Sequence, residues 1–206
     1  MKKSVYSLVL SDAVVDAVDR RAALMNTSRS NLINQILAEY ASLTTPEKRM
    51  SEIFEKVKSA VLNYGTMQVQ DTLSDSMMSL KSTVKYKYNP TVRYIVELYR
   101  NYEEAIGRLK VYIRTQSPSL IHEVNNFFQL WAAIEGVNCK QYSIEDGKFE
   151  RIFIAKPDIG DEQIAGYISD YIKRLDRCMK EYFAHLDDPS YAKSRVIQQY
   201  EKGESL

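Results

Sequence analysis

The most informative segment for predicting the fold of this 206-residue chain is SVYSLVLSD, residues 4–12. Tyr6, Leu8 and Leu10 alternate with Val5, Ser7 and Val9. A period of two places successive side chains on opposite faces of a strand, so this pattern predicts a strand from Lys3 to Leu10.

Two short helices are predicted directly after this strand. Ser11 or Asp12 can cap the first helix, whose apolar residues from Val14 to Met25 recur every three or four positions. Asn26 tolerates the left-handed backbone that ends a helix. Ser28 is a suitable N-cap for a second apolar helix, which ends before Thr44-Thr45-Pro46.

These first 45 residues are too few to form a stable core alone. Segments of about 45 residues rarely fold without a metal, a disulfide or a second chain. A single strand also leaves an unpaired edge that can pair with a copy of itself. The sequence therefore predicts an intertwined homodimer, or a higher oligomer built from it.

The order of strand, cap, helix, turn and second helix in residues 3–43 resembles the ribbon-helix-helix DNA-binding domains of the MetJ/Arc type. In that family, the strands of two subunits form an antiparallel ribbon that enters the major groove of double-stranded DNA. The resemblance implies that outward side chains of the ribbon read bases and that the start of the second helix binds a phosphate. The DNA-binding residues it implies are Lys2, Lys3, Val5, Ser7, Val9, Thr27, Ser28, Arg29 and Ser30.

The rest of the chain predicts an α+β fold with an antiparallel sheet. Pro46 opens a connector helix to about Tyr64, and a link continues to residue 75. Three alternating stretches, 78–88, 92–99 and 108–114, predict a meander with one apolar face and one basic face. We assign residues 76–186 to one α+β domain of unknown role and residues 187–206 to a C-terminal tail.

Two long helices and a hairpin complete this predicted domain. Ser117-Pro118 begins an apolar helix that runs to about Glu135 and is expected to cover the sheet. Glu145-Asp146-Gly147 is a hairpin signal between two short strands. Gly160-Asp161 precedes a helix that runs to about Leu186, and a short helix is expected between Pro189 and Tyr200.

The net charge of +1 hides segments of opposite charge. Residues 76–115 carry a net charge of +5, whereas residues 116–206 carry −4. The basic face of the predicted meander is a second candidate surface for DNA, because cations interleaved with tyrosines can hold a backbone and stack bases. The alternatives are a solvated face, a face docked on the acidic C-terminal helices, and a protein-binding surface. Its cations are Lys81, Lys85, Lys87, Arg93, Arg108, Lys110 and Arg114.

Other classes of protein are disfavoured by the absence of their motifs. The chain contains no glycine-rich phosphate loop, GxSxG or HExxH, so we expect no enzyme activity and no cofactor. His122 and His185 stand alone, and Cys139 and Cys178 form no CxxC pair, so we expect no metal site. No apolar run is long enough to span a membrane, and we expect a cytoplasmic protein.

We therefore expect a homodimeric DNA-binding transcriptional regulator, most simply a repressor. Its C-terminal domain is expected to serve oligomerisation, effector binding or contact with a protein partner. The alternatives are an accessory DNA-binding protein of a plasmid or mobile element, which acts in replication, partition or transfer, and an antitoxin-like interaction module.

Overall fold

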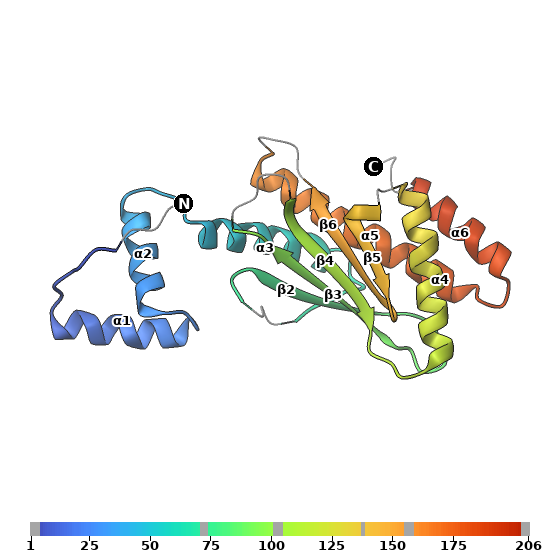
Figure 1. Ribbon diagram of the computed structural model, residues 1–206, viewed down its shortest axis with the longest axis horizontal. Helices are drawn as coiled ribbons and strands as arrows, with labels where there is room; N and C mark the ends of the chain where they lie inside the picture. Colours follow the sequence, from blue (N-terminus) through green and yellow to red (C-terminus); the bar gives the residue numbers. More distant parts are fainter. Residues whose placement is uncertain (1–4, 71–73, 101–104, 137–138, 155–158, 203–206) are drawn as a thin grey trace. The chain divides into compact units, whose positions relative to one another are not determined.

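The computed structural model describes residues 5–70, 74–100, 105–136, 139–154 and 159–202. The chain divides into two compact units, residues 1–49 and residues 50–206. Figure 1 shows the helices and strands of both units.

The first unit contains two helices joined by a tight turn. Helix α1 spans Asp12–Leu24 and helix α2 spans Arg29–Tyr40. Ser11 occupies the N-cap position of α1, but its side chain makes no capping hydrogen bond, which differs from the prediction. Asn26 has a positive φ of 51° in the turn that follows α1. Ser28 caps α2, because its Oγ accepts a hydrogen bond from the Asn31 amide at 3.2 Å. These two helices and their turn confirm the prediction.

Residues 5–10 form no strand in this chain, which differs from the prediction. The physical reason is that a strand is defined by its ladder of hydrogen bonds to a neighbouring strand. The alternation in this segment predicts such pairing with a second copy, and that pairing stays a prediction.

The second unit is built on a six-stranded antiparallel sheet in the order β1-β2-β3-β4-β6-β5 (Figure 1). The strands β2, β3 and β4 are consecutive, which confirms the predicted meander, and β5 and β6 form the predicted hairpin. The turn of this hairpin places Asp146 and Gly147 at positive φ. The strand bounds are β1 Gln68–Val69, β2 Met77–Thr83, β3 Thr91–Leu98, β4 Ala105–Ile113, β5 Tyr142–Glu145 and β6 Lys148–Ile154.

Strand β2 is shorter than the sequence predicted. The alternation of tyrosine and lysine continues to Tyr88, but β2 ends at Thr83. The Asn89 amide donates to the Tyr86 carbonyl at 2.7 Å, and Asn89 has a φ of 46°. A turn therefore takes up the residues that would have extended the strand, and Lys85 and Lys87 lie in the loop between β2 and β3.

The helices of the second unit share one core with one face of the sheet. The helix bounds are α3 Pro46–Leu62, α4 Pro118–Glu135, α5 Asp161–Ala184 and α6 Pro189–Lys202, and η1 Cys139–Gln141 is a short 3-10 helix. The residues of α3 from 50 onward belong to this second unit. Ser117 caps α4 as predicted, with its Oγ 3.4 Å from the Leu120 amide. Figure 1 shows α3 and α5 behind the sheet.

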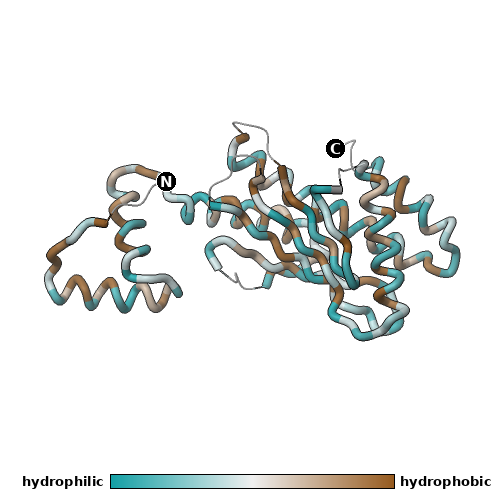
Figure 2. Tube along the Cα trace, in the orientation of Figure 1, coloured by the Kyte–Doolittle hydropathy of each residue, from teal (hydrophilic) through white to brown (hydrophobic). Residues whose placement is uncertain are grey.

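The core contains large aromatic and aliphatic side chains from every layer. Trp131 and Phe128 of α4 and Phe149 of β6 are fully buried, and the last two stack with their ring centroids 5.2 Å apart. Figure 2 shows the alternation of apolar and polar residues along the strands that supplies one apolar face. Residues 187–206, which we assigned to a tail, include α6, whose Ala192 and Val196 are fully buried.

Candidate functional site

The start of α2 presents backbone amides in the way the resemblance implies. The Ser28 hydroxyl caps the Asn31 amide, and the Asn31 side chain donates to Thr27 Oγ1 at 2.9 Å. The amides of Arg29 and Ser30 belong to the first turn, where a helix has no internal acceptor for them. Ser28, Arg29 and Ser30 are exposed, so this turn is open to an anion.

Arg29 is engaged by a carboxylate that the sequence analysis did not assign to it. Its Nε and Nη2 donate to the two carboxylate oxygens of Asp19 on α1. The hydrogen bonds from Arg29 lower the pKa of Asp19 and raise the pKa of Arg29. The positive charge at the start of α2 is therefore shared with α1, and Lys2 and Lys3 lie outside the described residues.

The segment before α1 exposes all of its apolar side chains. Val5 and Val9 are 98% and 102% exposed, and Tyr6, Leu8 and Leu10 are 85%, 59% and 40% exposed. The alternation assigns Tyr6, Leu8 and Leu10 to the interior of the predicted ribbon and the valines to its outward side, and this assignment stays a prediction. Ser7, also assigned outward, is exposed.

The helices of the first unit also keep apolar surface exposed. Only Ala22 of α1 and Leu32 of α2 are buried. Of the eighteen large apolar side chains that are exposed in the described part of the chain, twelve lie between residues 5 and 43. Those outside the strand-like segment are Val14, Leu24, Met25, Ile36, Leu37, Tyr40 and Leu43.

The second candidate surface is the sheet face that points away from the core. Arg93 of β3 and Arg108, Lys110 and Tyr112 of β4 alternate with buried core residues on their strands, and Lys81 of β2 is paired with Arg93. Buried helix residues belong to the opposite, apolar face. The acidic C-terminal helices α5 and α6 therefore do not cover this basic face, contrary to one of the alternatives above.

Two glutamates neutralise part of this face. Arg108 Nε lies 2.6 Å from a carboxylate oxygen of Glu97, and Lys110 Nζ lies 3.2 Å from one of Glu150. Arg108 also approaches Glu150 at 3.7 Å. Glu97 and Glu150 occupy alternating positions on β3 and β6, so their place on this face could have been found from the sequence once the strand order was known.

The remaining cations of the predicted surface lie toward one end of the sheet. Lys81 and Arg93 have no carboxylate partner among the described residues, and Arg93 donates to Gln70 Oε1 at 3.0 Å. Lys85 and Lys87 lie in the β2–β3 loop, and Arg114 follows β4. These two loops leave the same end of the sheet, because Thr83, at the end of β2, is opposite Thr91 and Ile113 is opposite Val92.

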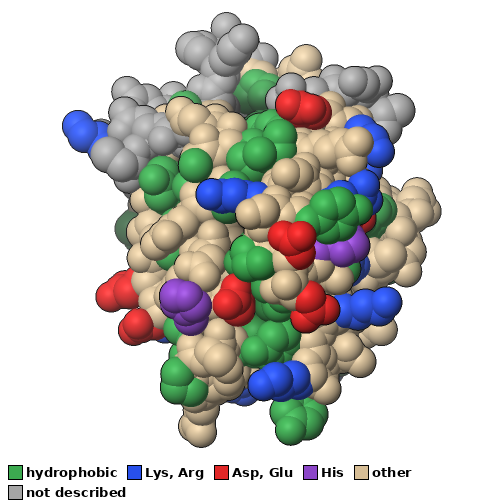
Figure 3. Space-filling view, turned by 90° about the vertical axis from the view of Figure 1, so that its right-hand side faces the viewer, with side chains coloured by type: hydrophobic (Ala, Val, Ile, Leu, Met, Phe, Trp, Pro, Cys, Tyr) green, Lys and Arg blue, Asp and Glu red, His purple; other side chains and the backbone are tan. Residues whose placement is uncertain are grey.

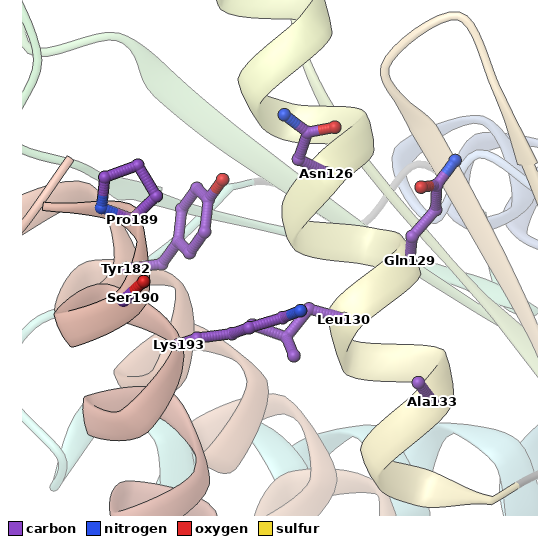
Figure 4. Close-up of a pocket in the computed structure, with 8 residues that line it drawn as sticks. All are labelled: Asn126, Gln129, Leu130, Ala133, Tyr182, Pro189, Ser190 and Lys193. Atoms are coloured by element: carbon purple, nitrogen blue, oxygen red, sulfur yellow. The ribbon is translucent and has the colours of Figure 1, made fainter.

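A hollow between α4, α5 and α6 has a volume of about 530 Å³ (Figure 4). Its walls include Asn126 and Leu130 of α4, Tyr182 of α5, and Ser190 and Lys193 of α6. The Tyr182 hydroxyl donates to Glu123 at 2.9 Å, and burial raises the pKa of this phenol. No nucleophile paired with a base lines the hollow, so nothing in it indicates a reaction.

The two histidines are separate from each other. Figure 3 shows them as distinct patches with acidic side chains between them. Across the described ranges, no three histidine, cysteine, aspartate or glutamate side chains form a group that could hold a metal ion.

Comparisons of the chain with protein-family models, curated proteins and solved structures find no match. Among the helices of the described ranges, none has the length and apolar character needed to cross a bilayer.

Proposed function

We propose that residues 1–49 of two copies form a ribbon-helix-helix dimer that binds double-stranded DNA and acts as a transcriptional regulator. The observation that carries this proposal is that the alternating residues 5–10 are all exposed in the single chain. One side of this segment offers leucines to a partner, and the other offers Val5, Ser7 and Val9 to a groove.

Dimerisation is supported by the apolar side chains that the first unit exposes to solvent in the single chain. Full burial of a Leu, Val or Ile side chain contributes about 1.5–3 kcal/mol. Leu8, Leu10, Ile36 and Leu37 are each at least 40% exposed in the single chain. A second copy that pairs with residues 5–10 and packs on the helices would bury such residues and satisfy the open edge of the segment.

DNA binding is supported by the polar features of the same unit. The exposed first turn of α2 combines free amides with the positive end of a helix, which favours a phosphate oxygen. Val5 and Val9 can contact thymine methyl groups, and the Ser7 hydroxyl can donate to or accept from a base edge. In this proposal the second unit supplies oligomerisation, effector binding or a partner surface.

A pair of neighbouring substitutions separates the two sides of the proposed ribbon. Leu8→Glu places a charge on the inward side, and Val9→Glu places the same charge one residue away on the outward side. In sedimentation experiments we expect wild type and Val9→Glu to have twice the 23.8 kDa of one chain and Leu8→Glu to be monomeric. A dimer that persists in Leu8→Glu would contradict the proposed pairing.

DNA binding itself is tested by titrating a labelled duplex from upstream of the protein's own gene, with a random duplex as reference. We expect Lys3→Glu with Arg29→Glu to weaken binding. We expect Asp19→Asn to strengthen it, because this substitution releases Arg29 from its carboxylate partner. Wild-type affinity in the double variant would remove the DNA-ribbon proposal.

A further inference from the structure

We propose that the open face of the sheet in the second unit binds single-stranded nucleic acid along one row of side chains. This row, called the cationic row below, consists of Lys81 of β2, Arg93 of β3, Tyr112 of β4 and Lys148 of β6. This site is distinct from the duplex-binding ribbon proposed for residues 1–49.

The register of the sheet places the four residues side by side. Lys81 is directly opposite Arg93, Arg93 is opposite Tyr112, and Tyr112 is opposite Lys148. Neighbouring strands lie about 4.8 Å apart, so the row extends about 14 Å across the sheet. That length spans a few nucleotides of a backbone laid across the strands.

The charges of the row are not balanced within the protein. Like charges directly opposite each other on neighbouring strands destabilise a sheet, and Lys81 and Arg93 form such a pair. Two glutamates of this face, Glu97 and Glu150, already bind Arg108 and Lys110. A phosphate that bridges Lys81 and Arg93 would relieve this repulsion.

The sequence around Lys81 and Arg93 adds further positive charge near the row. Residues 76–96 contain four basic side chains and no acidic one. Glu145 stands at the β5 end of the row opposite Lys148, but no ion pair joins these two side chains in the described structure. The uncompensated charge is therefore concentrated on β2 and β3 and in the loop that joins them.

Tyr112 favours a single strand over a duplex or an acidic protein segment. It is partly exposed between the cations of β3 and β6, where its ring can stack on an unpaired base. The bases of a duplex are already stacked inside the helix and cannot use it. The row therefore offers both parts of a single-strand site, cations for the backbone and an aromatic ring for a base.

The experiment uses the full chain and a labelled oligodeoxythymidine of about twelve nucleotides, within the usual range of site sizes. We expect Lys81→Gln with Arg93→Gln to weaken binding at least about tenfold and to reduce the slope of log affinity against log salt by about 1.4. The matched control removes two exposed cations of α6, Lys193→Gln with Lys202→Gln, and should leave affinity unchanged. Equal weakening in both variants would overturn the proposal.

The contribution of the ring is tested by Tyr112→Leu, which should weaken oligonucleotide binding at least about fivefold. If Tyr112→Leu binds like wild type, the row is an electrostatic surface for another polyanion, such as an acidic peptide, and the proposal is wrong. Failure of wild type to bind the oligonucleotide at low salt would also overturn it. Unchanged circular dichroism and a melting temperature no lower than that of wild type show that each variant is folded.

The Leu8→Glu variant distinguishes this proposal from the previous one. It should lose duplex binding with the dimer but keep its affinity for the oligonucleotide, because the whole row lies within one chain. We expect Leu8→Glu to lose duplex binding alone. We expect the variant with Lys81→Gln and Arg93→Gln to lose oligonucleotide binding alone. If Leu8→Glu loses both activities, the row is not an independent site.

Discussion

At the scale of single residues, Asp176 is the most deeply buried polar side chain in the described part of the chain. It lies on α5 and is fully buried. One carboxylate oxygen accepts from the Tyr94 hydroxyl of β3 at 3.0 Å, and the other lies 2.6 Å from Lys180 Nζ. Thr66, before β1, also donates to it at 3.4 Å. This carboxylate therefore ties three separate parts of the chain together.

We predict that Tyr94→Phe lowers the free energy of unfolding by about 1–3 kcal/mol, because it leaves a buried acceptor without its donor. Asp176→Ala should cost more than Tyr94→Phe, because it removes the acceptor that Tyr94, Thr66 and Lys180 share and leaves a cavity. The matched control is Tyr88→Phe, since Tyr88 is 93% exposed and should be neutral. Urea unfolding measures all three, and equal values for the two tyrosine variants would contradict the assigned role of Asp176.

The thiol of Cys178 gives a prediction about pH. It is buried on α5, where Sγ lies 3.7 Å from the Val196 carbonyl oxygen of α6, and burial raises its pKa to about 12. An unfolded cysteine titrates at about 8.5. Because the folded pKa is the higher one, the stability contributed by the protonated thiol is complete below about pH 8.5 and is lost as pH rises toward 12.

This loss is measurable by comparing wild type with Cys178→Ala in denaturant at several pH values. We expect wild type to lose stability relative to the variant between about pH 8.5 and pH 10. In a Cys139→Ser background, Cys178 should also resist a thiol reagent at pH 8 until the chain is unfolded. Rapid labelling of the native protein would show that the thiol is not buried as described.

At the scale of elements, Gly107 determines how β4 pairs with β3. It lies where the register of β4 against β6 shifts, beside Ala105. A Cβ atom at this position would stand 2.2 Å from the Glu97 carbonyl oxygen, which belongs to the backbone and cannot move aside as a side chain could. The close approach of β3 to β4 therefore requires glycine here.

We predict that Gly107→Ala destabilises the second unit by more than about 2 kcal/mol. The matched control is Gly166→Ala in α5, where a Cβ atom meets nothing within 4 Å. There alanine should stabilise the helix by about 0.5–1 kcal/mol. Thermal unfolding of the two variants measures the difference, and shifts of the same sign would contradict the close approach.

The accuracy of the sequence predictions for elements follows from how local each signal is. The caps at Ser28 and Ser117 and the turn at Asn26 were predicted correctly, because they depend on residues a few positions apart. The end of β2 was not, because the alternation continues through a turn closed by Asn89. The length of a strand depends on where its hydrogen bonds to the neighbouring strand end, and a local sequence pattern does not contain this information.

At the scale of the whole molecule, the two units differ in how much of their apolar surface they bury. The second unit has a contiguous core from its sheet and helices. The first unit, residues 1–49, buries a single apolar side chain in each of α1 and α2. We infer that the second unit is stable as a single chain, whereas the first gains its stability from association.

We predict two unfolding transitions that respond differently to protein concentration. The transition of the first unit should move to higher denaturant as concentration rises, because dimerisation stabilises the folded state by mass action. The transition of the second unit should stay constant. In Leu8→Glu the first transition should lose its concentration dependence, and a concentration-independent first transition in wild type would contradict the dimer.

The candidate sites were predicted to different degrees. The start of α2 and its Ser28 cap were predicted correctly, because a cap and a short helix are local features, and their binding of a phosphate stays a prediction. The cations of the basic face were predicted, but the two glutamates that neutralise Arg108 and Lys110 were not. Glu97 and Glu150 come close to these cations only because β3, β4 and β6 pair with one another. Lys148 was missed for the same reason, because its position in the cationic row depends on the placement of β6 beside β4.

The helices, the caps at Ser28 and Ser117, the hairpin and the α+β class could be predicted from the sequence, because they follow from periodicity and from residues that contact one another along the chain. The pairing of Arg29 with Asp19, the burial of α6 and the neutralisation of Arg108 and Lys110 became visible only in the tertiary structure. Each of these depends on residues brought together from separate elements. In SVYSLVLSD, the alternation assigns two sides to the segment, and its pairing into a strand with a second chain stays a prediction, because the hydrogen bonds of such a strand would come from another molecule.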